Sequence, residues 1–323
     1  MAKPILAVPI GDPCGIGPEI LAAALATGEP QRAARILLIG SSAAMQQGMQ
    51  VAGVTLPICE LARTRDLPDS GDELYLFDDG LLAADEIEYG VERASCGAAV
   101  GRWIDTAQTL AGAGVVDGVV MSPVNSESMA AGDALGTLMD VEPGSRFLAV
   151  FSGPLRIIHI FDHVLLQDVC AQLSADKVEQ ALKTTHSTLE SYGIPAPRIG
   201  VAGLNPHAHG PQEDNAIAPG IERARAAGIN AIGPESPDSV FRQCIEGKYD
   251  VVLAMCHDQG HIALKTWGFE GNCGGFIGMP YLFMTTGHGT AFDIAGKGIA
   301  SHAMMLSALN QCAAFAAGDG FLS

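Results

Sequence analysis

The length, composition and charge of the chain limit what it can be. Its 323 residues suit two domains of roughly 150 residues each, and 48% hydrophobic residues against 17% charged ones exclude disorder over most of the chain. Lys and Arg number 18 against 36 Asp and Glu, a formal charge of −18, so the electrostatic signature of a protein that binds nucleic acid or an anionic membrane is absent. A small anionic substrate would need local cations or a metal to overcome this charge.

The sequence also predicts a cytoplasmic protein. No run approaches the roughly 18–20 apolar residues of a membrane span, so we expect no membrane association. The first residues lack the small-residue cleavage site of a secretory signal. The eight cysteines are dispersed without a C-x-x-C pair, which favours reduced thiols over a disulfide scaffold or a zinc knuckle.

Strand-like runs of β-branched residues alternate with alanine-rich helical patterns along the chain. In chain order, the predicted strands are Ile5–Ile10, Arg35–Ile39, Gly114–Met121, Leu155–Phe161, Arg198–Leu204, Tyr249–Met255 and a run that ends at Thr285. Predicted helices begin near Pro18 and after an N-cap at Ser41-Ser42, and others cover Ser95–Ala113 and Ser174–Leu189. The alternation predicts βαβ units, a largely parallel sheet and the α/β fold class.

Polar residues follow four of the predicted strands. They are Asp162-His163, Asn205-Pro206-His207, His257-Asp258 and Thr285–His288. In open α/β sheets, ligands bind beyond the carboxyl ends of the strands. We therefore expect the active site at these strand ends.

The nine histidines all lie between His159 and His302. His163, His207 and His257 each follow a predicted strand, and three neutral imidazoles with open positions would hold a divalent transition metal. The competing interpretation is three unrelated loop histidines that bond to backbone groups. His159 and His261 lie near these candidates in the sequence, either as their hydrogen-bonding partners or as ordinary core or surface residues.

Two further side chains close to His257 have candidate roles. Asp258 would orient an imidazole, take part in proton transfer or cap a turn. Lys265 follows the apolar, strand-like run Ile262–Leu264. A lysine at the end of a strand is usually a solvated surface charge, but one that faces the cleft of so acidic a chain would anchor a carboxylate.

Two glycine-rich segments lie near the ends of the chain. Gly11–Glu19 lacks the G-x-G-x-x-G spacing and the Walker lysine, so a tight turn is its leading explanation. Gly287–Gly298 would let backbone N–H groups approach a ligand closely, although it could also be an ordinary loop that enters a helix at Ile299. The side chains of this segment that would contact a ligand are His288, Thr290, Asp293 and Lys297.

Four motifs occur in order along nearly the whole chain. They are Gly11–Glu19 (GDPxGIGPE), Gly203–Ala208 (GLNPHA), Ala254–Gly260 (AMxHDQG) and His288–Gly298 (HGTAFDIAGKG). Together they resemble the 4-hydroxythreonine-4-phosphate dehydrogenase family of vitamin B6 synthesis. The resemblance implies two α/β domains with an active-site cleft between them, similar to the isocitrate and isopropylmalate dehydrogenases, in a homodimer. The first domain would comprise residues 1–124 and 287–323, and the second residues 125–286.

The resemblance also implies roles for individual residues. His163, His207 and His257 would hold a divalent metal, with the third contributed by the partner subunit, so that the active site lies at the subunit interface. Lys265 matches the family's substrate lysine, and Asp238 matches an acidic active-site position. The residues that would bind NAD are His288, Gly289, Thr290, Asp293, Gly296 and Lys297.

The chain departs from the family at positions that bind the phosphorylated substrate. The Gly-His-Thr-Glu motif is missing between Asn125 and Phe147, because Met129–Glu142 is shorter there and has no His-Thr pair. Three further positions replace a lysine, an arginine and an asparagine by Ser126, Phe283 and Gly274, respectively. Since a phosphate needs several donors or bidentate ones, these losses argue against a phosphorylated substrate.

A second branch of the family, terephthalate cis-dihydrodiol dehydrogenase, is similar to this chain at several of these points. It too lacks the Gly-His-Thr-Glu motif, and it has histidines at the positions of His159 and His261 and Gly-His-Gly as at Gly287. An apolar Phe283 suits a six-membered carbon ring. The shortened segment Met129–Glu142 departs from this branch as well.

We therefore expect a metal- and NAD-dependent dehydrogenase that oxidises a β-hydroxy acid, with decarboxylation following. The expected substrate is a small, anionic, non-phosphorylated cyclic dihydrodiol carboxylate such as terephthalate cis-dihydrodiol, which would place the enzyme in aromatic catabolism. Zinc suits a histidine-rich site best, ahead of cobalt, manganese and magnesium. The alternatives are the vitamin B6 enzyme itself and a non-catalytic homologue that binds metal or ligand without turnover.

Overall fold

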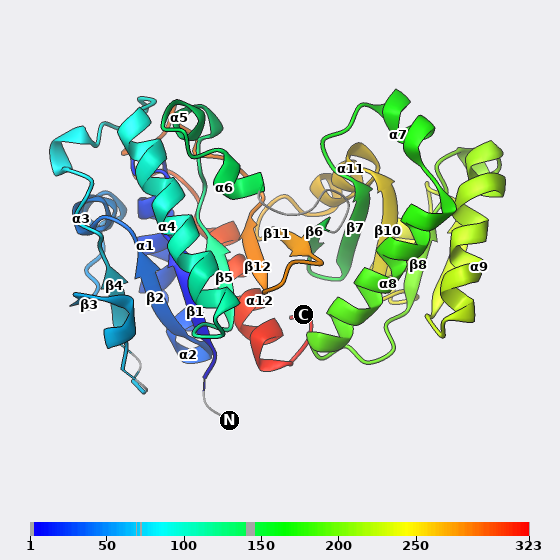
Figure 1. Cartoon of the computed structure of the whole chain (residues 1–323), viewed down its shortest axis with the longest axis horizontal. Helices are drawn as coiled ribbons and strands as arrows, with labels where there is room; N and C mark the ends of the chain where they lie inside the picture. The colour runs from blue at the N-terminus through cyan, green and yellow to red at the C-terminus, as the bar shows by residue number, and fades with distance from the viewer. Residues whose placement is uncertain (1–2, 69, 72, 140–145, 323) are drawn as a thin grey trace. The chain divides into compact units, whose positions relative to one another are not determined.

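The chain divides into two α/β units in this computed structural model, which describes residues 3–68, 70–71, 73–139 and 146–322 (Figure 1). Unit 1 comprises Met1–Asp140 and Pro280–Ala317, and unit 2 comprises Val141–Met279 and Gly318–Ser323. The sequence placed the boundaries after residues 124 and 286 and kept the C-terminus in the first domain. From Gly318 onward the chain groups with unit 2, where the rings of Phe321 and Phe151 lie 5.5 Å apart.

Unit 1 contains strands in the order β3-β4-β2-β1-β5-β12, and the neighbouring strands are parallel. The strands are β1 (Ile5–Pro9), β2 (Arg35–Ile39), β3 (Ile58–Leu61), β4 (Leu74–Phe77), β5 (Gly118–Met121) and β12 (Phe283–Thr286). The α-helices are α1 (Gly17–Ala26), α2 (Glu29–Ala33), α3 (Ser42–Ala52), α4 (Ala94–Gly112), α5 (Ser126–Ala131), α6 (Gly136–Met139) and α12 (Ala303–Ala317). The short 3₁₀ turns are Thr64–Asp66 and Ala84–Glu86.

Three features of the sequence produce the local structure in unit 1 that they predict: an apolar strand, an N-cap serine and a proline in the first turn of a helix. Every residue of β2 is buried, because helices cover both faces of a parallel sheet and its strands become continuous apolar runs. The Ser41 side chain accepts a hydrogen bond from the Ala44 backbone N–H and begins α3. Pro18 stands in the first turn of α1, where its missing N–H costs nothing.

Unit 2 contains strands in the order β11-β6-β7-β10-β8-β9. The strands are β6 (Phe147–Ser152), β7 (Leu155–Phe161), β8 (Ile199–Ala202), β9 (Ala231–Glu235), β10 (Val251–Cys256) and β11 (Cys273–Ile277). Strand β6 runs antiparallel to β7 and β11, and the β7-β10-β8-β9 part is parallel. The helices are α7 (Leu166–Gln172), α8 (Ala175–Ser191), α9 (Ala218–Ala226), α10 (Val240–Ile245) and α11 (His257–Trp267), with a 3₁₀ turn at Pro206–Ala208 and a π-turn at Glu213–Ile217.

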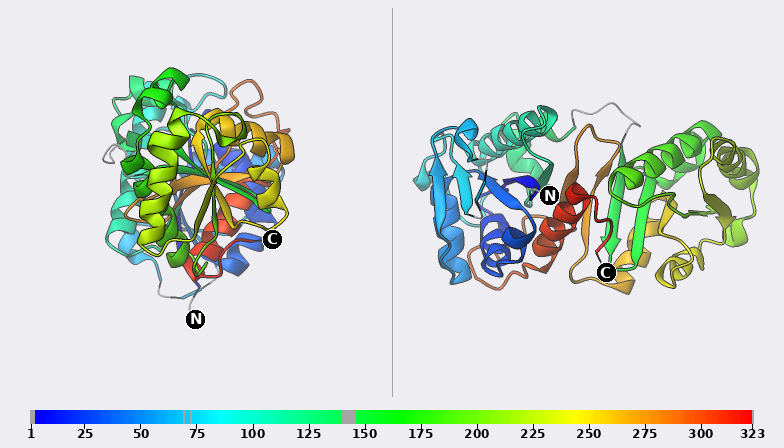
Figure 2. Two further views of the ribbon diagram at one scale, coloured as in Figure 1. Left: turned by 90° about the vertical axis from the view of Figure 1, so that its right-hand side faces the viewer. Right: turned by 90° about the horizontal axis from the view of Figure 1, so that it is seen from below.

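Helices cover both faces of the sheet in unit 2. Figure 2 (left) shows the green α8 and yellow-green α9 on one side of the fan of strands, and the golden α10 and α11 on the other. A core cluster on the α10–α11 side includes Ile157 of β7, Ala254 of β10 and Leu264 of α11. This packing fixes α11 directly beside the carboxyl ends of β7 and β10.

The order of the strands brings three predicted strand ends to one edge. Strand β10 lies between β7 and β8, and all three are parallel, with Phe161 of β7 opposite Cys256 of β10. The segments that carry His163, His257 and His207 therefore leave neighbouring strands at the same edge of the sheet. The alternating strands and helices confirm the α/β prediction.

Two local predictions were wrong. The run Ile262–Leu264 is part of α11 and not a strand, because a helical spacing buries Gly260 and Leu264 against the sheet while Ile262 points to solvent. Helix α12 begins at Ala303 and not at Ile299, because the Ser301 hydroxyl accepts a hydrogen bond from the Ala303 N–H and stops the helix from extending further back.

No helix in the described part of the chain is both long enough and apolar enough to span a bilayer. This result agrees with the absence of a long apolar run in the sequence.

Candidate functional site

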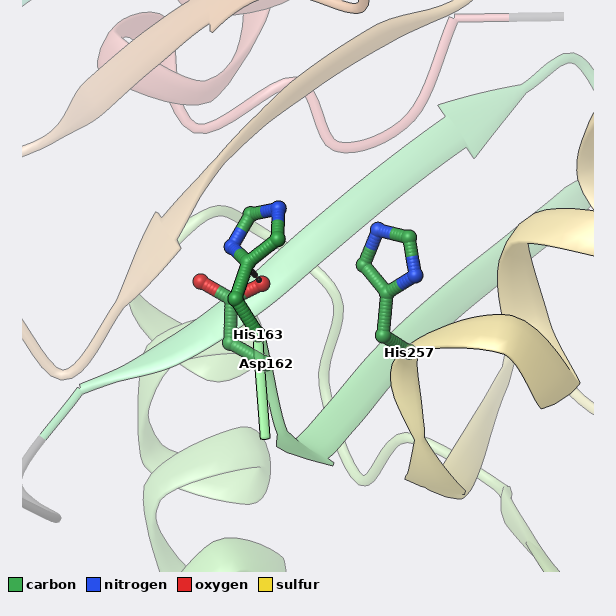
Figure 3. A group of neighbouring side chains, drawn as sticks. All are labelled: Asp162, His163 and His257. Atoms are coloured by element: carbon green, nitrogen blue, oxygen red, sulfur yellow. Dashed lines mark ion pairs between the residues drawn. The ribbon is translucent and has the colours of Figure 1, made fainter. Parts of the chain in front are cut away.

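Three potential metal ligands meet at the edge of the sheet in unit 2 (Figure 3). Asp162 and His163 directly follow β7, and His257 is the first residue of α11 after β10. One ligand atom from each lies within 4.8 Å of the other two, and the rings of His163 and His257 are 4.9 Å apart. A cavity of about 380 Å³ opens beside the group, lined also by Val164, Leu165, Leu166, Cys256 and Asp258.

A carboxylate lies close to each imidazole of this group. The His257 Nδ1 atom forms a hydrogen bond with Asp258 at 2.9 Å, and this bond lowers the pKa of Asp258. The His163 Nδ1 atom lies 2.9 Å from a carboxylate oxygen of Asp162. A carboxylate only accepts hydrogen bonds, so the Nδ1 of a neutral His257 carries the proton and Nε2 keeps a lone pair for a ligand.

Two further histidines, His261 and His159, lie next to His257. The His261 ring stacks on the His257 ring at 3.9 Å and 12°, one helical turn along α11. The fully buried His159 ring of β7 lies 4.9 Å from His261, and its Nδ1 is 3.1 Å from the Leu148 carbonyl. An added Cβ at Gly260 would overlap the His159 Nε2, so only glycine allows α11 to pack this closely on β7.

Burial keeps these two histidines neutral. Burial, with smaller contributions from His261 and His257, lowers the pKa of His159 to about 3. Burial and the neighbouring His257 also lower the pKa of His261, to about 4. Both imidazoles are therefore uncharged at neutral pH.

The metal-free protein is expected to lose stability as the pH falls from about 6.5 to about 4. Unfolding restores the ordinary pKa of both histidines, so the unfolded chain binds more protons in this range, at about 1.4 kcal/mol per pH unit for each proton. The His159→Met variant should show a shallower slope, and the exposed His209→Asn variant should keep the wild-type slope. Urea denaturation between pH 7 and pH 4 measures both; an unchanged slope in His159→Met would contradict the prediction.

The predicted ligand His207 lies on a separate loop. It is exposed in the turn Pro206–Ala208 after β8 and has a left-handed backbone, with φ of +57°. The buried carboxylate of Glu213 fixes the start of this loop by accepting hydrogen bonds from the Leu204 and Asn205 backbone N–H groups. Burial opposes the ionisation of Glu213, but the hydrogen bonds from Asn205 hold its pKa below the ordinary value.

Two imidazoles and a carboxylate fit a divalent transition metal. Such mixed nitrogen and oxygen donors bind zinc, manganese, cobalt and iron in proteins. The described residues that come together in this way are Asp162, His163 and His257, and His207 is outside the group. His163 and His257 meet within one chain, whereas the resemblance assigned His257 to the partner subunit. Ligation by His207 and across a dimer stays a prediction.

Lys265 and Asp238 occupy different parts of unit 2. Lys265 is exposed on α11, and the spacing of four residues puts it on the same helix face as His257 and His261. Asp238 is exposed in the turn before α10, where it accepts a hydrogen bond from the Ser236 hydroxyl at 2.7 Å. Lys265 is thus aligned with the histidines along α11, and the role of Asp238 stays a prediction.

The two glycine-rich segments pack against each other in unit 1. The Ile16 N–H donates to the Thr290 carbonyl at 3.0 Å, and the Gly296 N–H donates to the Glu19 carboxylate at 2.8 Å. A Cβ at Gly15 would lie 2.8 Å from the Thr290 Cβ. The first and last motifs of the chain therefore form one structural element.

The predicted NAD-binding side chains in this element differ in exposure. Thr290 is buried against Gly15, and His288 turns its Nδ1 to within 2.9 Å of the Gly289 carbonyl. Asp293 and Lys297 are exposed, and the Lys297 ammonium donates to the Asp293 carbonyl. NAD binding by these residues and by Gly289 and Gly296 stays a prediction.

Sequence reasoning missed Asp162 as a potential ligand and the stacking of His261 on His257. A signal existed for both: Asp162 directly precedes His163 at the strand end, and His257 and His261 are one helical turn apart if the segment is a helix. The shortened segment Met129–Glu142 extends beyond the described residues, since 140–142 lie outside them.

Comparison with known proteins decides the family. The model of the PdxA family, described as pyridoxal phosphate biosynthetic protein PdxA, matches residues 32–312. The chain belongs to the PdxA family. It is therefore a dehydrogenase of a family that depends on NAD and a divalent metal.

Two curated relatives match this PdxA-family chain over nearly its whole length. One from Novosphingobium aromaticivorans, provisionally named a 4-hydroxythreonine-4-phosphate dehydrogenase, is 43% identical over 99% of this chain and 97% of its own. Another from Halalkalibacterium halodurans, provisionally named a D-threonate 4-phosphate dehydrogenase, is 37% identical over 97% of both chains.

Solved structures agree with this assignment. A 4-hydroxythreonine-4-phosphate dehydrogenase from Burkholderia phymatum has a TM-score of 0.85 at 29% identity, covering 98% of this chain and 99% of its own. A terephthalate 1,2-cis-dihydrodiol dehydrogenase from Burkholderia xenovorans has a TM-score of 0.67 at 29% identity, covering 95% and 96%. Both enzymes of the predicted resemblance are thus among the structural neighbours.

Proposed function

We propose that this PdxA-family enzyme oxidises a secondary alcohol β to a carboxylate, with NAD as the hydride acceptor, and that the β-keto acid then loses carbon dioxide. The observation that supports this proposal most is the group of Asp162, His163 and His257 at the edge of the sheet, with ligand atoms within 4.8 Å of one another. An alcohol adjacent to a carboxylate-bearing carbon is the substrate pattern that such a group would serve.

The side chains around the group would orient it and keep it neutral. Asp258 orients the His257 ring through a hydrogen bond to Nδ1, which leaves the Nε2 lone pair for a metal ion. The stacked His261 and the buried His159 are uncharged at neutral pH, so they add no repulsion toward a cation. A divalent ion held by Asp162, His163 and His257, with His207 as a further predicted ligand, would lower the pKa of the substrate hydroxyl and stabilise negative charge on the same oxygen after oxidation.

Lys265, Asp258 and Asp238 are the proposed groups for anchoring and proton transfer. The Lys265 ammonium, on the helix face that carries His257, would bind the substrate carboxylate or return a proton to the carbon that loses carbon dioxide. Asp258 or Asp238 would accept the hydroxyl proton or orient its acceptor. The loop residues His288–Gly298 would hold the NAD, which accepts the hydride and dissociates as NADH.

Removing the metal is expected to abolish NAD reduction. Dialysis against a chelator should lower turnover by about three orders of magnitude, because the ion supplies several kcal/mol of charge stabilisation. Adding back zinc, cobalt, manganese or magnesium in parallel identifies the metal, and we propose zinc for this histidine-rich group. Absorbance of NADH at saturating substrate is the measurement. Full activity after metal removal would refute the proposed chemistry.

The proposed substrate is a non-phosphorylated cyclic dihydrodiol carboxylate, as in aromatic catabolism. Three replacements support it by removing donors that a phosphate would need: Ser126, which donates its hydroxyl to Glu127, and the buried residues Gly274 and Phe283. The names of the two curated relatives favour a second candidate, a phosphorylated hydroxy acid. NAD reduction with terephthalate cis-dihydrodiol and with 4-hydroxythreonine 4-phosphate distinguishes them; faster turnover of the phosphorylated compound would overturn the first.

The proposed enzyme works in the cytoplasm as a homodimer with its active site at the subunit interface. The resemblance of the four motifs to the dimeric family supports this assembly. Light scattering of the purified protein measures its mass. If the protein reduces no NAD with either substrate in the presence of added metal, the correct interpretation is a non-catalytic homologue that binds a ligand.

A further inference from the structure

Two buried cysteines of unit 1 are in contact, although they are far apart in the sequence. The Sγ atoms of Cys14 and Cys96 lie 3.5 Å from each other, and both residues are fully buried. Cys14 belongs to the glycine-rich segment Gly11–Glu19, and Cys96 lies in the first turn of α4. Both are free thiols, and the function proposed above uses neither of them.

The hydrogen bonds around the pair make Cys14 the more reactive sulfur. The Glu88 backbone N–H donates to the Cys14 Sγ at 3.4 Å, and the Cys96 thiol is placed to donate to it as well. The hydrogen bond from Cys96 lowers the pKa of Cys14 more than burial raises it, and the bond from Glu88 lowers it further. Because the thiolate is the nucleophilic form of cysteine, Cys14 is the sulfur that an oxidant would meet first.

The segment that covers the pair lies at the surface of unit 1. The Glu86 carbonyl lies 3.7 Å from the Cys96 Sγ, and Glu88 contacts Cys14. No residue of the 3₁₀ turn Ala84–Glu86 is buried, and Glu88 is exposed. A short surface segment with few buried contacts opens at a lower free-energy cost than the core does. Such an opening would admit a molecule as small as hydrogen peroxide.

We propose that Cys14 and Cys96 are a site of reversible oxidation, at which a hydroperoxide joins them in a disulfide. The Cys14 sulfur attacks hydrogen peroxide, so that an S–O bond forms, the O–O bond breaks and water leaves. The Cys96 sulfur then attacks the Cys14 sulfur, so that the S–S bond forms, the S–O bond breaks and the oxygen leaves as a second water. The two thiols lose two electrons and the peroxide gains them. A dithiol reductant reverses the reaction by exchange.

The disulfide would link the Gly11–Glu19 segment covalently to α4. In the reduced protein, non-covalent contacts hold this segment, among them the hydrogen bond from the Ile16 N–H to the Thr290 carbonyl. Cys14 stands at the open position of GDPxGIGPE, so the pair is a feature of this chain and not of the motif. Disulfides in cytosolic proteins of mesophiles are usually transient and catalytic or redox-sensing, which agrees with a bond that forms only when an oxidant is present.

Peptide mapping by mass spectrometry tests the proposal on the full-length protein. The folded protein is treated with hydrogen peroxide, and its remaining thiols are blocked before digestion. The digest should contain a new species that joins the peptides of Cys14 and Cys96, with a mass two hydrogen atoms below their sum. Dithiothreitol should remove this species. The exposed Cys59 reports in the same digest whether the oxidant has acted.

Two variants separate the roles of the sulfurs. In Cys96→Ser the disulfide cannot form, so Cys14 should stay as a sulfenic acid that dimedone traps. Cys244→Ser is the matched control, because it removes a buried thiol of unit 2 that donates to the Pro154 carbonyl at 3.5 Å. It should form the Cys14–Cys96 disulfide to the same extent as the wild type.

Three results would overturn the proposal. They are unmodified thiols at both positions in a sample whose Cys59 is oxidised, a disulfide from Cys14 or Cys96 to some other cysteine in place of this one, and sulfinic or sulfonic acid at Cys14 beside an unmodified Cys96. The wild-type digest alone decides among these results, so the test stands even if Cys96→Ser fails to fold. The test needs neither NAD nor substrate, so its outcome is independent of the proposed function.

Discussion

Replacing His257 by alanine is expected to lower turnover about a thousandfold, because it would remove a proposed ligand of the ion that, in the proposed mechanism, stabilises the reacting oxygen by several kcal/mol. His257 offers one of three ligand atoms within 4.8 Å of one another, and Asp258 fixes its ring. Without the ring, only Asp162 and His163 remain of this group, so the metal content per chain should fall together with activity. NADH formation and elemental analysis of the same samples measure both.

His186→Ala is the matched control for this variant. His186 is also a histidine of unit 2, but it lies on α8 opposite Glu190, at 3.4 Å, and outside the ligand group. It should keep wild-type activity and metal content. A His257→Ala protein with full metal content would place the metal elsewhere, and one with full activity would remove His257 from the mechanism.

Gly97→Ala in α4 is expected to lower the free energy of unfolding by about 3 kcal/mol or more. Helix α4 packs on α5 at this glycine, and an added Cβ would overlap the backbone carbonyl group of Ser128. A backbone group of a packed helix cannot rotate away as the end of a flexible side chain can. The two helices would have to separate and expose buried side chains such as Met129. Urea denaturation measures the loss.

A second glycine at the end of the same helix provides the control. No atom lies within 4 Å of an added Cβ at Gly112, so alanine meets no neighbour there. Since alanine favours the helix over glycine by up to about 1 kcal/mol, Gly112→Ala should leave the protein as stable as the wild type or more stable. Equal unfolding midpoints for Gly97→Ala and Gly112→Ala would show that α5 moves aside at little cost.

The strands that the sequence predicted best are the buried parallel ones. Arg35–Ile39 and Leu155–Phe161 agree with β2 and β7 to the residue, because a strand covered on both faces is mostly apolar and stands out in the sequence. Strands β4, β6, β9 and β11 were not predicted. Strand β3 was missed as well. It lies at the edge of the sheet of unit 1 and exposes Cys59 and Glu60, so its sequence carries no comparable apolar run.

Part of the candidate site was also predicted because two of its residues directly follow strands with a clear apolar pattern. His163 and His257 follow strands whose ends are readable, and the structure brings the two rings together. The helix that begins at His257 was misread as containing a strand, because three apolar residues in a row carry no period. That error concealed the stacking of His261 on His257 and the alignment of Lys265 with both.

The sequence by itself determined the α/β class, the strand ends at which polar residues gather, and the histidines available for a metal, because these depend on local patterns of apolar and polar residues. Only the tertiary structure decided that β10 lies between β7 and β8, that Asp162 joins His163 and His257, and that Cys14 contacts Cys96. Strand order and long-range contacts depend on how distant segments pack, and no local pattern encodes that packing.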